Sequence, residues 1–96
     1  MERKELKVVR THEFMIHADF HRDELLSVSS QASRFASDIL LSYTESEHEH
    51  RVDVKSLLGM ALLPLRNGSI VRLQTKGRDE LEALEYMLYV LEKGPA

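Results

Sequence analysis

The clearest pattern in the chain is a stripe of leucines near its C-terminal end. Leu81, Leu84, Leu88 and Leu91 recur every three or four residues, and glutamates fill positions between them. Side chains at this spacing share one face of a helix, so the pattern predicts an amphipathic helix over residues 79–92. A helix that buries only one face needs a second layer to cover that face. The rest of the chain must therefore supply that layer.

The remaining segments alternate between strand-like and helix-like patterns. Period-two alternation predicts strands within residues 6–20, 39–43, 51–54 and 70–75, and helical spacing predicts a helix over residues 23–35. A short apolar segment between Ser56 and Pro64 predicts a brief helix over residues 57–63. Arg10 and His12 interrupt the first strand pattern, which leaves its start open. The order of these segments predicts an α+β fold, in which three single-faced helices cover one side of a four-stranded antiparallel sheet.

A run of polar residues separates the two middle strands. Residues 44–50 read Thr-Glu-Ser-Glu-His-Glu-His and predict a hairpin with a long, solvated loop. His48 and His50 could bind a metal ion only transiently, because the loop supplies no third ligand at a known spacing. We therefore expect neither a metal site nor a cofactor.

Size and composition limit the function. The chain has 96 residues, 43% of them apolar, which predicts one domain over residues 1–96. The net charge of -3 argues against a nucleic-acid partner, because no basic stripe could neutralise a run of phosphates. The chain has no cysteine, signal-peptide pattern or membrane-length apolar run, so we expect a cytoplasmic protein without a membrane partner. It also lacks a nucleotide-binding loop and a nucleophile-base set, which argues against turnover catalysis.

Several short motifs resemble those of one protein family. They are Val-Lys-Ser-Leu-Leu-Gly-Met at residues 54–60, Asn-Gly at residues 67–68, Lys-Gly-Arg-Asp-Glu at residues 76–80 and Ala-Ser-Arg-Phe at residues 32–35. Their spacing resembles that of the HPr family, the histidine-containing phosphocarriers of the bacterial sugar phosphotransferase system. The resemblance runs over residues 8–92 and implies the family's open-faced sandwich, with a longer hairpin loop at residues 45–48.

The resemblance implies that Ser56 is a regulatory phosphorylation site. In the family a lysine-serine pair opens a short helix, and here the pair is Lys55-Ser56. The flanking Leu57, Leu58 and Met60 are similar to the family's exposed apolar patch, which contacts HPr kinase/phosphorylase and the catabolite regulator. The alternative is that Ser56 only caps its helix, because serine is a favoured N-cap residue.

The family's other phosphorylation site is a histidine at the start of the first helix, followed by alanine, arginine and proline. Counting back without gaps from residues 32–35 places this histidine at His21, where the sequence reads His-Arg-Asp-Glu. A competing alignment uses His17, within Ile-His-Ala, and needs an extra helical turn. We prefer His21 because it needs no insertion within a helix. Its alternative role is that of a surface residue in the first turn.

The residues after His21 change the electrostatics of this helix start. Free backbone N–H groups and the helix dipole favour a phosphoryl group there, and the dipole contributes only ~0.3–1 kcal/mol. Asp23 and Glu24 occupy the positions of the family's arginine and proline. One such charge about 4 Å from a phosphate charge costs on the order of 4 kcal/mol at an effective dielectric of about 20, before screening. We therefore expect His21 to be a poor phosphate acceptor, although Arg22 could offset the repulsion by swinging inward.

Three functions fit these observations. The first is a regulatory protein similar to the catabolite-repression variant of the family, phosphorylated on Ser56. The second is a working phosphocarrier that relays phosphate from enzyme I to sugar-specific phosphotransferase proteins through His21. The third is a phosphate-independent interaction module that kept the fold. The signalling interpretation expects the helix starts at His21 and Ser56 to lie side by side on one rim.

Overall fold

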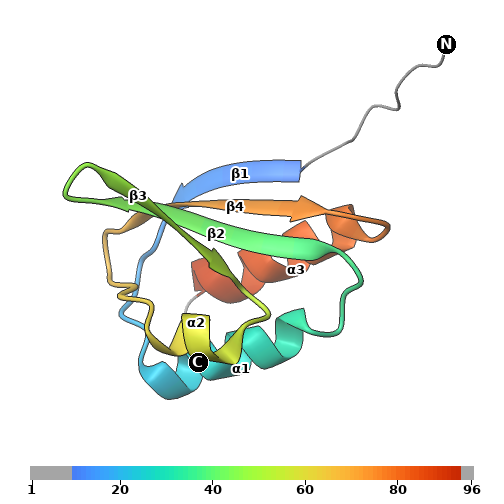
Figure 1. Cartoon of the computed structure of the whole chain (residues 1–96), viewed down its shortest axis with the longest axis horizontal. Helices are drawn as coiled ribbons and strands as arrows, with labels where there is room; N and C mark the ends of the chain where they lie inside the picture. The colour runs from blue at the N-terminus through green and yellow to red at the C-terminus, as the bar shows by residue number, and fades with distance from the viewer. Residues whose placement is uncertain (1–9, 94–96) are drawn as a thin grey trace, which may run out of the picture.

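The computed structural model describes residues 10–93 of the chain. Its elements are β1 (Arg10–Met15), α1 (Arg22–Ala32), β2 (Asp38–Glu45), β3 (His48–Asp53), α2 (Leu57–Ala61), β4 (Ile70–Lys76) and α3 (Glu80–Lys93). Figure 1 shows the helices gathered on one side of the sheet. The order and type of the elements agree with the sequence-based expectation. The part of the first strand prediction that covers residues 6–9 lies outside the described residues.

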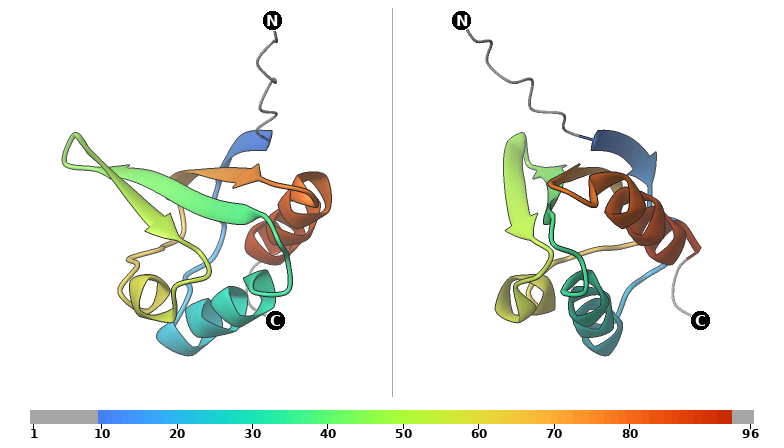
Figure 2. Two further views of the ribbon diagram at one scale, coloured as in Figure 1. Left: turned by 45° about the vertical axis from the view of Figure 1, so that its right-hand side comes forward. Right: turned by 90° about the vertical axis from the view of Figure 1, so that its right-hand side faces the viewer.

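The four strands form one antiparallel sheet in the order β1-β4-β2-β3. Phe14 on β1 lies opposite Val71 on β4, and Leu73 on β4 lies opposite Leu41 on β2. Because side chains alternate between the faces of a strand, these apolar residues point to the same side. The helices cover that side, and in the views of Figure 2 no helix or strand of residues 10–93 covers the other side. The predicted α+β open-faced sandwich is therefore confirmed.

The core fills the space between the sheet and the helices. The two central strands contribute inward side chains that are at most 1% exposed, namely Ile39, Leu41, Val71 and Leu73. The helix α3 buries Ala83, Leu84, Met87 and Leu91. Leu81, which we had placed on the buried stripe, is 46% exposed. It falls on the flank of α3, about 100° of rotation from the centre of the buried face.

The connection between β2 and β3 is a two-residue turn, so the prediction of a long loop is wrong. Glu45 pairs with His48, and Ser46 and Glu47 between them have φ angles of 52° and 65°. Two consecutive residues with positive φ are typical of the type I′ turn that joins hairpin strands. The polar residues on each side extend the strands instead. Residues 44–50 are all exposed, so no alternation between apolar and polar side chains marks them as strand.

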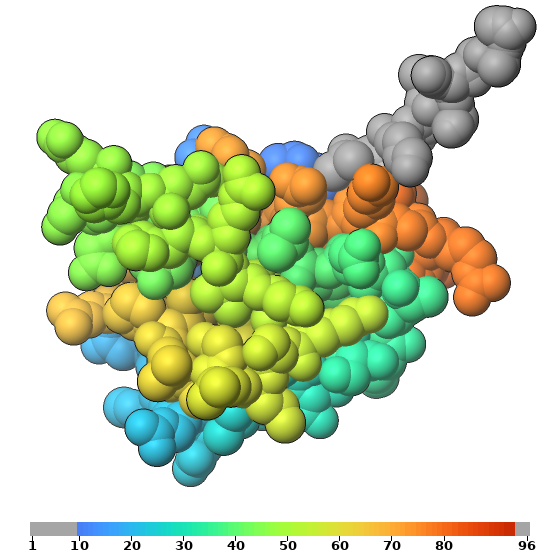
Figure 3. Space-filling model, viewed as in Figure 1, coloured from blue at the N-terminus to red at the C-terminus, as the bar shows by residue number. Residues whose placement is uncertain are grey.

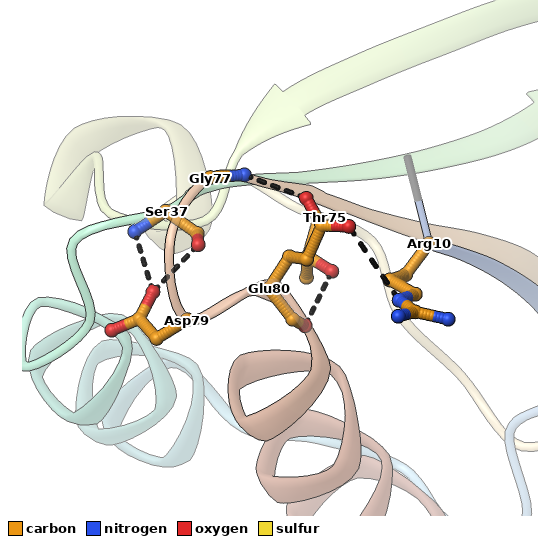
Figure 4. A network of polar contacts seen from close by, with 6 residues as sticks. All are labelled: Arg10, Ser37, Thr75, Gly77, Asp79 and Glu80. Carbon is orange, nitrogen blue, oxygen red and sulfur yellow. Dashed lines mark hydrogen bonds and ion pairs between the residues drawn. The ribbon is translucent and has the colours of Figure 1, made fainter. Parts of the chain in front are cut away.

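Asp79 joins the start of α3 to the connection between α1 and β2 (Figure 4). Its carboxylate accepts hydrogen bonds from the Ser37 hydroxyl at 2.6 Å, the Ser37 N–H at 2.9 Å and the Ala36 N–H at 2.9 Å. These bonds favour the ionised carboxylate. The Ser37 hydroxyl contributes most, and together the bonds lower the pKa of Asp79 from 3.8 to about 2.

Glu80, the first residue of α3, contacts the start of β1 and the end of β4. Its carboxylate accepts a hydrogen bond from the Gly77 N–H at 2.9 Å and lies 3.5 Å from the Arg10 guanidinium. Its carbonyl accepts a hydrogen bond from the buried Thr75 hydroxyl at 2.7 Å. Gly77 has a φ of 150°, and a Cβ there would lie 2.6 Å from the Ser37 Cα. Only glycine avoids both the strained conformation and the clash.

Acidification is expected to weaken the fold through Asp79. The pKa of Asp79 is lower in the folded state than in the unfolded chain, so its ionised form stabilises the fold above a pH of about 4. This contribution is lost as the pH falls from about 4 to about 2. Urea unfolding followed by circular dichroism should show a steeper loss of stability in this range for the parent protein than for Asp79→Asn. Ser37→Ala should fall between them, and an equal pH dependence of all three proteins would contradict this role.

Candidate functional site

Ser56 lies at the start of α2 and caps it. Its Oγ accepts a hydrogen bond from the Gly59 N–H at 3.1 Å, as expected of a serine N-cap. Asp53 fixes the approach to the helix. Its carboxylate accepts a hydrogen bond from the Lys55 N–H at 3.0 Å, and its carbonyl accepts one from the Ser56 N–H at 2.9 Å. The Ser56 side chain remains partly exposed in this position.

Three leucines on α2 and at its C-terminal end form an exposed apolar surface, which we call the α2 patch. Leu57, Leu58 and Leu62 are 55%, 74% and 71% exposed, and Figure 3 shows α2 at the molecular surface. The assignment of Met60 to this surface is wrong, because Met60 is completely buried and packs in the core with Leu63. Leu62 was missed, although its spacing of four residues from Leu58 places both on one helix face.

The two helix starts lie at opposite ends of the α1 and α2 pair. Lys55, just before α2, donates a hydrogen bond from Nζ to the Phe35 carbonyl, beyond the end of α1. Leu65, after α2, accepts one from the Phe20 N–H, before the start of α1. The helices therefore run in opposite directions (Figure 1). The prediction of adjacent helix starts is wrong, because the short connection from β3 delivers the chain to the far end of α1. A signalling surface shared by His21 and Ser56 therefore loses its support, and any regulatory role must depend on Ser56 and its own surroundings.

His21 is the N-cap residue of α1, and its side chain is exposed. The Glu24 carboxylate reaches back and accepts a hydrogen bond from the His21 backbone N–H at 2.7 Å, as in a capping box. Arg22 and Asp23 are exposed in the same turn, and Arg22 forms no ion pair within residues 10–93. This helix start therefore carries two carboxylates against one guanidinium, and Arg22 is not held against either of them.

The competing histidine, His17, is exposed in the connection between β1 and α1 and does not adjoin a helix. Which histidine corresponds to the family's phosphorylation site stays a prediction. His48 and His50 belong to β3 rather than to a loop, and the His50 ring stacks on Tyr43 with their centres 5.1 Å apart. Within the described part of the chain, no group of three or more potential ligands could hold a metal ion. None of the helices in residues 10–93 has the length and apolar character needed to cross a membrane.

The contrasting environments of Met60 and Leu62 give a direct test of this surface. Met60→Ala should lower the free energy of unfolding by about 2–5 kcal/mol, because it removes buried contacts and leaves a cavity. Leu62→Ala, with Leu58→Ala as a second surface variant, should change it by about 0.5 kcal/mol or less. Urea unfolding measures all three. A loss for Leu62→Ala as large as that for Met60→Ala would mean that the α2 patch is covered in solution.

Known proteins share both the sequence pattern and the fold. The family described as "PTS HPr component phosphorylation site" matches residues 25–93, a range that begins after His17 and His21. An HPr-like protein Crh from Halalkalibacterium halodurans is 35% identical over 63 residues, which cover 66% of this chain and 70% of that protein. A phosphocarrier protein HPr from Cupriavidus necator is 32% identical over 63 residues, which cover 66% of this chain and 71% of that protein.

A solved structure extends the likeness to the three-dimensional fold. The crystal structure of a phosphocarrier protein HPr from Bacillus anthracis superposes with a TM-score of 0.72 at 23% sequence identity. The superposition covers 82% of this chain and 92% of that one. The shared fold alone does not establish the family, whereas the family match over residues 25–93 does. This chain therefore belongs to the HPr family of the phosphotransferase system.

Proposed function

We propose that this protein is a regulatory member of its family that reports metabolic state through phosphorylation of Ser56. The similarity to Crh proteins, of which that from Bacillus subtilis is named for catabolite repression, supports a regulatory role. The observation that carries the proposal is the partly exposed Ser56 hydroxyl at the start of α2, flanked by the exposed Leu57 and Leu58. In this position the hydroxyl is accessible to a kinase, and the neighbouring leucines offer it a docking surface.

The local charges favour a phosphate at this helix start. The first turn of α2 contains no acidic residue, so the helix itself places no carboxylate beside the anion, and its backbone N–H groups attract it. The Asp53 carboxylate lies before the helix and is hydrogen-bonded to the Lys55 N–H. A phosphate adds about −1.5 to −2 charges beside the α2 patch, which gives a partner a clear difference to recognise. We propose HPr kinase/phosphorylase and the catabolite regulator as the partners of the α2 patch, and the cytoplasm as the place where they meet.

Incubation with HPr kinase/phosphorylase and ATP should label the parent protein on Ser56. Ser56→Ala should abolish the labelling and reduce stability by about 0.5–2 kcal/mol, because the hydroxyl also caps α2. Ser30→Ala is the matched control, since Ser30 is an exposed serine on α1. Mass spectrometry of the labelled peptides identifies the site. If Ser56→Ala is labelled as well as the parent protein, the Ser56 assignment is wrong.

We also propose that His21 is a degraded phosphohistidine site. Asp23 and Glu24 place two carboxylates in the first turn of α1, and Glu24 already accepts the His21 N–H. A phosphoryl group on the imidazole would approach both negative charges. The alternative, a working phosphocarrier, is favoured by the exposed position of His21 at a helix N-terminus, where backbone N–H groups attract anions.

Phosphorylation by enzyme I and phosphoenolpyruvate separates these alternatives. We expect slow, weak, acid-labile labelling of the parent protein. The double variant Asp23→Asn/Glu24→Gln should be labelled faster, because it removes both charges and keeps the polar groups in place. His21→Ala and His17→Ala identify which histidine is labelled.

Rapid labelling of the parent protein that His21→Ala abolishes would establish the working carrier instead. Absence of labelling at both His21 and Ser56, with enzymes shown to be active on another HPr protein, would favour the phosphate-independent interaction module. In that case the α2 patch would bind its partner without a phosphate.

A further inference from the structure

Among the described residues, β3 ends the strand order of the sheet, and neither proposed phosphorylation site uses it. The polar residues beside the turn lengthen the hairpin rather than its loop, which extends the edge of β3. Figure 3 shows this hairpin at the surface, projecting at one corner of the molecule. An exposed strand edge can pair with another chain through its outward backbone groups.

Two residues of β3 leave all their backbone hydrogen-bonding groups facing outward. The Val54 N–H donates to the Ile39 carbonyl at 2.9 Å, and alternate residues of an antiparallel strand face the same neighbour. The even-numbered residues of β3 therefore bond to β2, and Glu49, Arg51 and Asp53 face the free edge. The Asp53 carbonyl already accepts a hydrogen bond from the start of α2. Glu49 and Arg51 thus form the available edge.

A second copy of the chain fits this edge in one register. When two β3 strands pair in antiparallel fashion about a two-fold axis at His50, Glu49 of each copy lies opposite Arg51 of the other. The N–H and carbonyl groups of both residues are then all hydrogen-bonded. A shift of two residues in one direction places the two Glu49 residues opposite each other, and a shift in the other direction does the same for the two Arg51 residues. In both cases fewer backbone groups are hydrogen-bonded. Cross-strand charge and backbone pairing therefore select the register centred on His50.

We propose that β3 pairs with β3 of a second copy and forms a sheet that is continuous across two molecules. The two Glu49 to Arg51 pairs would lie on the open face of the sheet. Glu49 already lies 3.8 Å from Arg72 of β4 on that face, and both side chains are about half exposed. The pairing therefore leaves the buried core unchanged. The contact is short, so the dimer is weak and forms with rising protein concentration.

Exchange of the two charges tests this pairing. Analytical ultracentrifugation of the parent protein, up to millimolar concentration, should show a monomer–dimer equilibrium. Glu49→Arg alone and Arg51→Glu alone should each weaken the dimer by about tenfold, because each variant places like charges opposite one another at both pairs. A mixture of the two variants should restore association as a heterodimer, since each substituted side chain again meets an opposite charge.

Matched variants separate this effect from net charge. Glu85→Arg and Arg78→Glu make the same charge changes at exposed positions away from β3, so both should associate as the parent protein does. Thermal unfolding confirms that Glu49→Arg is folded, because this variant also loses the contact with Arg72. The proposal is overturned if the parent protein stays monomeric at millimolar concentration. It is also overturned if either β3 variant associates like the parent, or if their mixture associates no better than each variant alone.

Discussion

Burial of one face of the sheet is the constraint on which the rest of this structure depends. Four inward apolar side chains of β2 and β4 are at most 1% exposed, namely Ile39, Leu41, Val71 and Leu73. Such burial is the main favourable term in folding. A sheet with one apolar face needs cover on that side only, so all three helices gather there. The residues at the helix starts and at the free strand edge are not needed to bury this face. They are therefore the places where charged and polar residues can serve binding.

Sequence reasoning predicted best the elements that alternate between buried and exposed positions. The strand β4 and the helix α3 agree with the prediction to within one residue at each end, because their apolar side chains recur with a clear period. The β2 and β3 hairpin was misjudged because residues 44–50 are exposed on both faces. Met60 was misplaced because five residues of helix are too few for periodicity to identify the buried face.

Local and distant contacts differ in how far they could be predicted. The cap at Ser56 involves Gly59, three residues along the chain, and the residue type alone indicates it. Asp79 can likewise be placed from the sequence, at the start of the predicted C-terminal helix. The groups that donate hydrogen bonds to it belong to Ala36 and Ser37, which are 43 and 42 residues away. The opposite directions of α1 and α2 likewise depend on where the strands deliver the chain. Contacts of this kind follow from topology, which a single sequence constrains only weakly.

The arrangement of the helix starts bears on how the two proposed sites influence each other. The first turn of α1 carries Asp23 and Glu24, whereas that of α2 carries no acidic residue. The starts lie at opposite ends of α2, whose five residues span about 7.5 Å. This length is comparable to the Debye length of about 8 Å at physiological ionic strength. Salt therefore weakens but does not remove the repulsion that the carboxylates beside His21 would exert at Ser56, so a change at the proposed histidine site would affect the proposed serine site only weakly.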